Sequence, residues 1–174
     1  MRWVLPVAVL LSVLFSALSA SAAQLTVNGG TLQVFTFPAN IPVPAPPECA
    51  GIPFGWGDVI VGTEGDDHIN GGDGSQLIFG FGGNDKITGG NGDDCIVGGD
   101  GDDDLHGGDG DDVILGGPDN DKIHGGNGND HLYGGSGDGD DEIKGSDGDD
   151  VIDGGPGSDE CNGGGGANTI TNCE

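Results

Sequence analysis

A single apolar side chain recurs every nine residues through most of this chain. Between Gly62 and Thr171 the sequence divides into twelve units, eleven of nine residues and one of eleven (134–144), and position eight of each unit is apolar. The preceding residues of a unit are mainly glycine and polar, which predicts a six-residue turn followed by a short strand with one inward side chain. One apolar residue per unit can form a core only beside its equivalents, so the pattern predicts an all-β fold, a parallel β-solenoid. The residues at position eight are Ile69, Ile78, Ile87, Ile96, Leu105, Ile114, Ile123, Leu132, Ile143, Ile152, Cys161 and Ile170.

Glycines and oxygen-bearing side chains occupy fixed positions in the predicted turns. Glycines at positions one, two and four permit positive φ and a close approach of neighbouring backbones. Carboxylate and amide oxygens follow at positions five and six, and such oxygens are the ligands that Ca²⁺ prefers. Position five carries Asp66, Asn84, Asp93, Asp102, Asp111, Asn120, Asn129, Asp140 and Asp149. Position six carries Asp67, Asp85, Asp94, Asp103, Asp112, Asp121, Asp130, Asp141, Asp150 and Asp159.

The most regular units resemble a known calcium-binding repeat. Residues 89–97 (GGNGDDCIV) and 107–115 (GGDGDDVIL) resemble the nonapeptide of RTX, or hemolysin-type, repeats, G-G-x-G-x-D-x-U-x. The resemblance covers 110 of the 174 residues, 62–171. It implies a right-handed parallel β-roll of about six coils, in which unit i lies over unit i+2 and several calcium ions lie between stacked turns. No attached toxin or enzyme domain is expected.

The resemblance places the turns on two sides of the roll. The turns of the first side begin at Gly62, Gly80, Gly98, Gly116, Gly134 and Gly154, and those of the second side begin at Gly71, Gly89, Gly107, Gly125, Gly145 and Gly163. Position six is Asp throughout the first side, whereas the second side begins with Gln76 and ends with Asn168. We therefore expect poor or empty ion sites at the two ends of the second side. We also expect the two-residue insertion in 134–144 to weaken the sites of its turn.

Composition and charge make the predicted fold depend on calcium. Of the 110 residues in 62–171, only 18 are Leu, Ile, Val or Phe, too few to offset the conformational entropy of the chain without metal. The whole chain has 30 acidic and 4 basic residues, a formal charge of −26. Stacked carboxylates repel one another, so calcium binding and folding are expected to be coupled. Nucleic acid is excluded as a partner, because phosphate binding needs clustered Lys and Arg.

The residues before the repeats have a different character. Residues 1–23 have a basic start, an apolar run and small residues at 19–23, the pattern of a cleaved signal peptide. We therefore predict a secreted protein without a membrane span after cleavage. Residues 24–47 are expected to form an apolar hairpin around Asn28-Gly29-Gly30 and a Pro-rich linker, 48–61 a cap, and 172–174 a tail.

The outward positions seven and nine differ between the two sheets of the roll. One sheet is polar there, and His106 and His124 are expected to stack in adjacent coils. We interpret them as exposed polar side chains rather than a transition-metal site, because no Cys or third His joins them. The opposite sheet is apolar, which indicates either a covering segment of the same chain or a protein or cell-surface polymer partner. Its face includes Leu77, Phe79, Val97, Val113, Leu115 and Tyr133.

The four cysteines indicate what could cover the apolar face. Four cysteines of an exported chain permit three pairings, and the sequence does not decide between them. A Cys161–Cys173 bond would fasten the tail, which leaves Cys49 to bond with Cys95 on the apolar face. We expect that bond to hold the amino-terminal segment against this face, with Phe54, Trp56 and Ile60 as apolar cover.

The sequence thus predicts a secreted calcium-binding protein without catalytic activity. Sequence motifs for a seryl nucleophile, a phosphate-binding loop and a zinc hydrolase are absent. A structural or adhesive module is the favoured interpretation, and a non-catalytic accessory subunit of a separately encoded secreted enzyme or toxin is the alternative.

Overall fold

The computed structural model describes residues 27–28, 31–32, 49, 52 and 59–174. The chain divides into two units, Met1–Pro42 and Val43–Glu174. In the first unit, β1 (Val27–Asn28) pairs antiparallel with β2 (Thr31–Leu32), where the hairpin was expected. The predicted signal peptide and Pro-rich linker lie outside the described residues.

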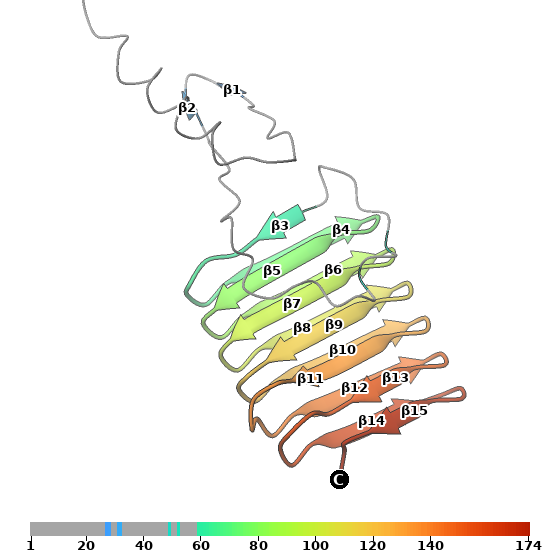
Figure 1. The fold of residues 1–174 in the computed structure, drawn as a ribbon. Helices are drawn as coiled ribbons and strands as arrows, with labels where there is room; N and C mark the ends of the chain where they lie inside the picture. Colours follow the sequence, from blue (N-terminus) through green and yellow to red (C-terminus); the bar gives the residue numbers. More distant parts are fainter. Residues whose placement is uncertain (1–26, 29–30, 33–48, 50–51, 53–58) are drawn as a thin grey trace, which may run out of the picture. The chain divides into compact units, whose positions relative to one another are not determined.

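The second unit is a stack of parallel strands in two sheets. One sheet has the order β14-β12-β10-β8-β6-β4 and the other β15-β13-β11-β9-β7-β5-β3, so each strand pairs with the strand two places away in sequence. Figure 1 shows this stack of alternating strands. The predicted all-β solenoid of about six coils, with unit i over unit i+2, is confirmed. The strands are β3 (Val59–Val61), β4 (His68–Asp73), β5 (Leu77–Gly82), β6 (Lys86–Asn91), β7 (Cys95–Asp100), β8 (Asp104–Asp109), β9 (Val113–Gly117), β10 (Lys122–Asn127), β11 (His131–Gly135), β12 (Glu142–Asp147), β13 (Val151–Asp153), β14 (Glu160–Gly164) and β15 (Thr169–Thr171).

The core is the column of position-eight side chains between the two sheets. From Ile78 to Ile152 these residues are 0–1% exposed and form one cluster. Strand register aligns them, with Ile96 beside Ile78 and Ile114, for example. The column opens at its end, where Ile170 is 43% exposed. This column contributes one buried apolar side chain per nine ordered residues, which by itself is too little to offset the entropy of ordering the chain.

The solenoid begins before the first predicted unit. Ile60 in β3 lies beside Ile78 and packs against the end of the core column. The expectation that Ile60 covers the outer face was therefore wrong. Residues 53–61 hold Asp58 and Ile60 at positions six and eight, but Pro53 and Phe54 replace the leading glycines, so this degenerate unit escaped the repeat pattern.

The apolar outer face is partly covered within the chain. Cys49 is bonded to Cys95, and both are buried in a cluster with Val113. Ile52, Leu77 and Tyr133 pack against this cluster. On the same face, Phe79 and Val97 are each only 5% exposed. The other two residues expected in the cover, Phe54 and Trp56, lie outside the described residues.

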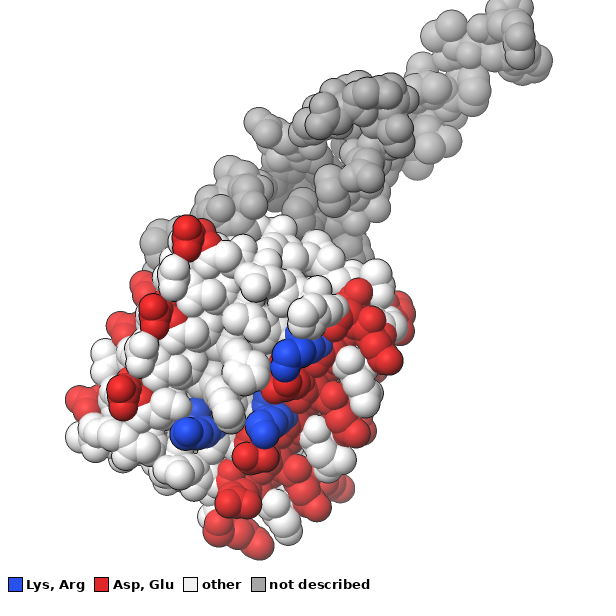
Figure 2. Space-filling view, turned by 180° about the vertical axis from the view of Figure 1, so that it is seen from behind, with Lys and Arg blue, Asp and Glu red and all other residues white. Residues whose placement is uncertain are grey.

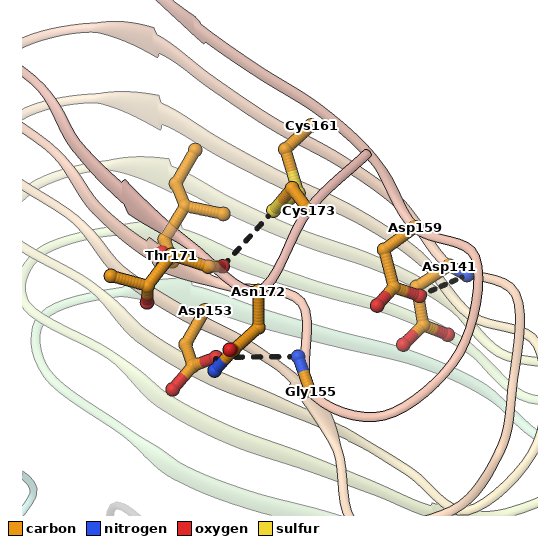
Figure 3. The surroundings of a disulfide bond; sticks show 9 residues. Asp141, Asp153, Gly155, Asp159, Cys161, Thr171, Asn172 and Cys173 are labelled. Atoms are coloured by element: carbon orange, nitrogen blue, oxygen red, sulfur yellow. Dashed lines mark hydrogen bonds between the residues drawn. A yellow bond between two sulfur atoms is a disulfide. The ribbon is translucent and has the colours of Figure 1, made fainter.

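A second disulfide closes the last coil. Cys161 is bonded to Cys173, and both pack against the end of the core column (Figure 3). The Glu174 N–H donates to the Asp159 carbonyl at 3.0 Å, as the Glu160 N–H does to the Asp141 carbonyl one coil earlier. The tail thus continues the backbone ladder of the solenoid.

Position two of most turns has a positive φ, which glycine adopts most easily. Gly108 and Gly126 have φ values of 126° and 132°, and the next residue of this column, Ser146, has φ of 98°. A residue with a side chain is strained at positive φ by roughly 1–2 kcal/mol. Glycine avoids this strain, but part of the advantage is lost because glycine gives up more conformational entropy on folding.

Ser146→Gly is therefore expected to stabilise the protein by about 1 kcal/mol. Thermal unfolding in saturating calcium, followed by circular dichroism, measures the change. Ser158→Gly is the matched control, because Ser158 is not among the residues with positive φ and gains no relief. A melting temperature of Ser146→Gly at or below that of the unmodified protein would contradict the strain argument.

Candidate metal-binding turns

The position-six side chains form a hydrogen-bonded ladder down each side of the solenoid. The Oδ1 atom of each accepts the backbone N–H of the position-six residue one coil earlier, as in Asp94 N to Asp112 Oδ1 at 2.8 Å. The ladder continues across the insertion in 134–144, where the Asp121 N–H donates to Asp141 Oδ1 at 2.8 Å. The other bonds join Asp67 to Asp85, Gln76 to Asp94, Asp85 to Asp103, Asp103 to Asp121, Asp112 to Asp130, Asp130 to Asp150, Asp141 to Asp159 and Asp150 to Asn168, at 2.7–3.0 Å.

In eight of the ten position-six aspartates the other carboxylate oxygen, Oδ2, is buried without a hydrogen-bond partner. The position-six aspartates from Asp85 to Asp159 are at most 5% exposed. A buried polar atom without a hydrogen bond is costly, and a charged one costs more. Because these unpartnered oxygens recur along both sides, bound cations would stabilise them. Among the described residues, the unpartnered Oδ2 atoms belong to Asp85, Asp94, Asp103, Asp112, Asp121, Asp130, Asp150 and Asp159.

Glycine at position one lets oxygen atoms converge beside each Oδ2. A Cβ atom on Gly107 would lie 2.1 Å from Asp112 Oδ2 and 2.7 Å from the carbonyl oxygen of Gly125 in the next coil. The corresponding distances at Gly89 are 2.2 Å to Asp94 Oδ2 and 2.8 Å to the carbonyl oxygen of Gly107. Carboxylate and carbonyl oxygens together suit the hard cation Ca²⁺.

These sites are built differently from a side-chain cluster. Among the described residues, no group of three or more His, Cys, Asp or Glu side chains could hold a metal ion. The aspartates instead lie one per turn along each ladder. Backbone carbonyl oxygens must therefore supply much of any coordination shell, which fits Ca²⁺ and not a metal that prefers nitrogen or sulfur.

Burial shifts the titration of the carboxylates in the metal-free fold. Loss of solvent raises the pKa of Asp112 and Asp121 to about 8 and that of Asp130 to about 7. The same cause raises the pKa of Asp94 and Asp103 to about 6. Neighbouring carboxylates add to each increase, and the backbone hydrogen bond to Oδ1 opposes it. The ionised ladder is thus unfavourable until a positive charge enters it.

The predicted ligands at position five lie in a different environment. All nine are exposed, and the Oδ1 atom of each accepts a backbone N–H from the following coil. Asp111 Oδ1, for example, accepts the N–H of Asn129 at 2.7 Å and its Nδ2–H at 3.2 Å. The structure therefore separates the predicted ligands into a buried row with unpartnered oxygens and an exposed row that links the turns.

The polar outer sheet carries ion pairs across its strands. Asp104 contacts the Lys86 ammonium group and also His106 Nε2, the latter at 2.9 Å, and Lys122 lies 3.6 Å from Glu142. His106 and His124 lie next to each other in adjacent coils as predicted, with ring centroids 4.9 Å apart and the rings edge to face. Burial and neighbouring positive charges lower the pKa of His124. Figure 2 shows the lysines of the described region on one face, next to rows of acidic residues. Exposed pairs of this kind contribute little to stability.

Fold and turns together define a calcium-binding β-solenoid. Four stretches of the chain match the RTX calcium-binding nonapeptide repeat, residues 57–80, 79–114, 106–138 and 136–170. The chain belongs to this family, and it is a calcium-binding repeat protein. The searches of curated proteins and of solved structures found no significant match. No helix in the described residues is long and apolar enough to cross a membrane.

Proposed function

We propose that this chain is an exported, non-catalytic calcium-binding module whose turns hold several ions between them. The position-six aspartates supply the inner ligands through Oδ2, and the position-five residues support the turns around them. The observation that carries this proposal is the row of eight buried Oδ2 atoms without partners. An ion beside each would remove the cost of the unpaired charge and screen the repulsion along the ladder.

Two separate observations support export. The amino-terminal sequence has the three parts of a signal peptide. Both disulfides, Cys49–Cys95 and Cys161–Cys173, fit an oxidising compartment, where calcium is also plentiful. Mass spectrometry of the protein from culture medium tests this directly, because export with cleavage predicts a first residue near Gln24.

A structural or adhesive role is the favoured use of the module. Its described part outside β1 and β2 consists almost wholly of stacked repeats, and repeat solenoids present extended surfaces for binding. The purified calcium-loaded protein is expected to bind cells or their surface polymer without help. Recovery of the protein only together with a separate secreted enzyme would favour the accessory-subunit alternative.

Calcium binding by the buried row is tested by Asp112→Asn. The asparagine keeps the Oδ1 acceptor for the Asp94 N–H but replaces the unpartnered Oδ2 with an NH₂ group. Equilibrium dialysis is expected to show at least one bound calcium ion fewer than in the unmodified protein.

The matched control is Asp111→Asn, the same change one residue earlier on the exposed row. It is expected to leave the number of bound ions unchanged. Circular dichroism in saturating calcium verifies that both variants fold. If Asp112→Asn, once folded, binds as many ions as the unmodified protein, the ligand assignment is wrong.

A further inference from the structure

We propose that Gln76 and Asn168 close the end turns of the second side with their own amide groups, each in the place of a calcium ion. This inference rests on the proposed function. These two turns would then be calcium-independent caps on either side of the calcium-binding turns. Gln76 and Asn168, which stand at position six in place of Asp, would decide where ions do not bind.

The Gln76 amide fills the first turn of the second side that the structure describes. Its Nε2 donates to the carbonyl oxygens of Asp73 and Gly74 at 3.0 and 2.5 Å. Its Oε1 lies 2.4 Å from the position that a Cβ atom on Gly71 would occupy. In the next turn of this side, Asp94 Oδ2 lies 2.2 Å from the equivalent Cβ position on Gly89. The amide therefore reaches the place of the carboxylate and directs its N–H groups at backbone oxygens. A cation would satisfy such oxygens with its positive charge, and the NH₂ group does so with two hydrogen bonds.

Gln76 also keeps the stacking of the ladder intact. Its backbone N–H donates to Asp94 Oδ1 at 2.7 Å, as the aspartates do. The Oε1 atom is buried without a hydrogen bond, but it is neutral. An unpaired neutral oxygen costs less than an unpaired carboxylate, so this turn needs no ion to balance it.

Asn168 does the equivalent in the last turn of the second side. Its Oδ1 accepts the Asp150 N–H at 2.7 Å and so completes the ladder. Its Nδ2 donates to the carbonyl oxygen of Gly165 at 3.1 Å, and it lies 2.5 Å from where a Cβ of Gly163 would stand. A donor thus replaces the unpartnered Oδ2 of the interior turns.

The carboxylate in the first turn of the first side also has hydrogen-bond donors from its own chain. Asp67 Oδ2 accepts hydrogen bonds from the Thr63 N–H at 2.6 Å and from the Thr63 hydroxyl at 2.9 Å. Thr63 stands at position two, where most turns have glycine. Three of the four end turns therefore have donors of their own, whereas eight other turns, the last turn of the first side among them, present an unpartnered Oδ2 atom.

The experiment exchanges each amide for the carboxylate of the same shape. Gln76→Glu and Asn168→Asp place a charged oxygen against the backbone carbonyls, which creates an oxygen-lined cation site. Native mass spectrometry is expected to show one more bound calcium ion in each variant than in the unmodified protein. Asn70→Asp, the same charge change at an exposed residue of the polar outer sheet, is the matched control and is expected to leave the ion count unchanged.

Two outcomes would overturn the proposal. One is a folded Gln76→Glu or Asn168→Asp protein that binds the same number of ions as the unmodified protein. The other is calcium density beside Gln76 Nε2 in crystals of the unmodified protein grown with calcium, a readout that does not depend on whether a variant folds. An unmodified protein that binds no calcium would refute the proposed function instead, so the two failures are distinguishable.

Discussion

Removal of calcium at pH 8 is expected to unfold the solenoid. At that pH most buried position-six carboxylates would be ionised, and they stack one per coil with unpartnered Oδ2 atoms. The core supplies only one buried side chain per unit, as in the column from Ile78 to Ile152, and cannot offset this repulsion together with the chain entropy. Circular dichroism of the disulfide-intact protein in excess chelator is expected to lose its β signal, and size-exclusion chromatography to show an expanded chain.

Calcium added back is expected to restore the fold, with a midpoint on the order of 10⁻⁴–10⁻³ M, as in extracellular calcium modules. Magnesium at the same concentration is the control. It is expected to fail, because it demands octahedral geometry and gives up its water ligands reluctantly. A β signal that survives chelation at pH 8 would show that the carboxylate ladders are tolerated without metal, and the coupling of binding to folding would then be wrong.

The repeat period made most of the fold predictable. An apolar residue at a fixed position over so many units predicts a column of stacked core residues, and the resemblance to RTX repeats implies that unit i lies over unit i+2. Ile96 accordingly lies between Ile78 and Ile114. The unit that contains Ile60 was missed because Pro53 and Phe54 hide its period. Its strand is part of the sheet because pairing with β5 needs only Val59, Ile60 and Val61, whatever residues precede them.

The site was predictable in position but not in detail. The sequence placed aspartates at position six, yet only the structure separates a bonded Oδ1 from an unpartnered Oδ2 in one carboxylate. The residues Gln76 and Asn168 appeared in the sequence only as missing carboxylates. Their role as donors depends on whether the amide group reaches carbonyl oxygens of its own turn. The spacing of residues in the repeat does not determine this.

Acid is expected to replace calcium in part. The pKa of Asp112 and Asp121 is about 8 in the metal-free fold, because burial disfavours their charge, against 3.8 for a carboxylate in an unfolded chain. Between these values the fold binds more protons than the unfolded chain, so its free energy of unfolding increases as the pH falls from 8 to 4. In excess chelator, circular dichroism is expected to show more β structure at pH 5 than at pH 8.

The calcium-bound protein is expected to respond in the opposite direction. Calcium must displace protons from Asp112, Asp121 and Asp130, so the calcium concentration at the folding midpoint should increase as the pH falls through 7. Asp112→Asn is the control for the chelated protein, because its side chain does not titrate and the gain of β structure in acid should be smaller. A chelated protein with less β structure at pH 5 than at pH 8 would contradict the argument, since it would mean that the fold prefers the ionised ladder. Agreement of both trends would show that protons and calcium compete for the same buried oxygens.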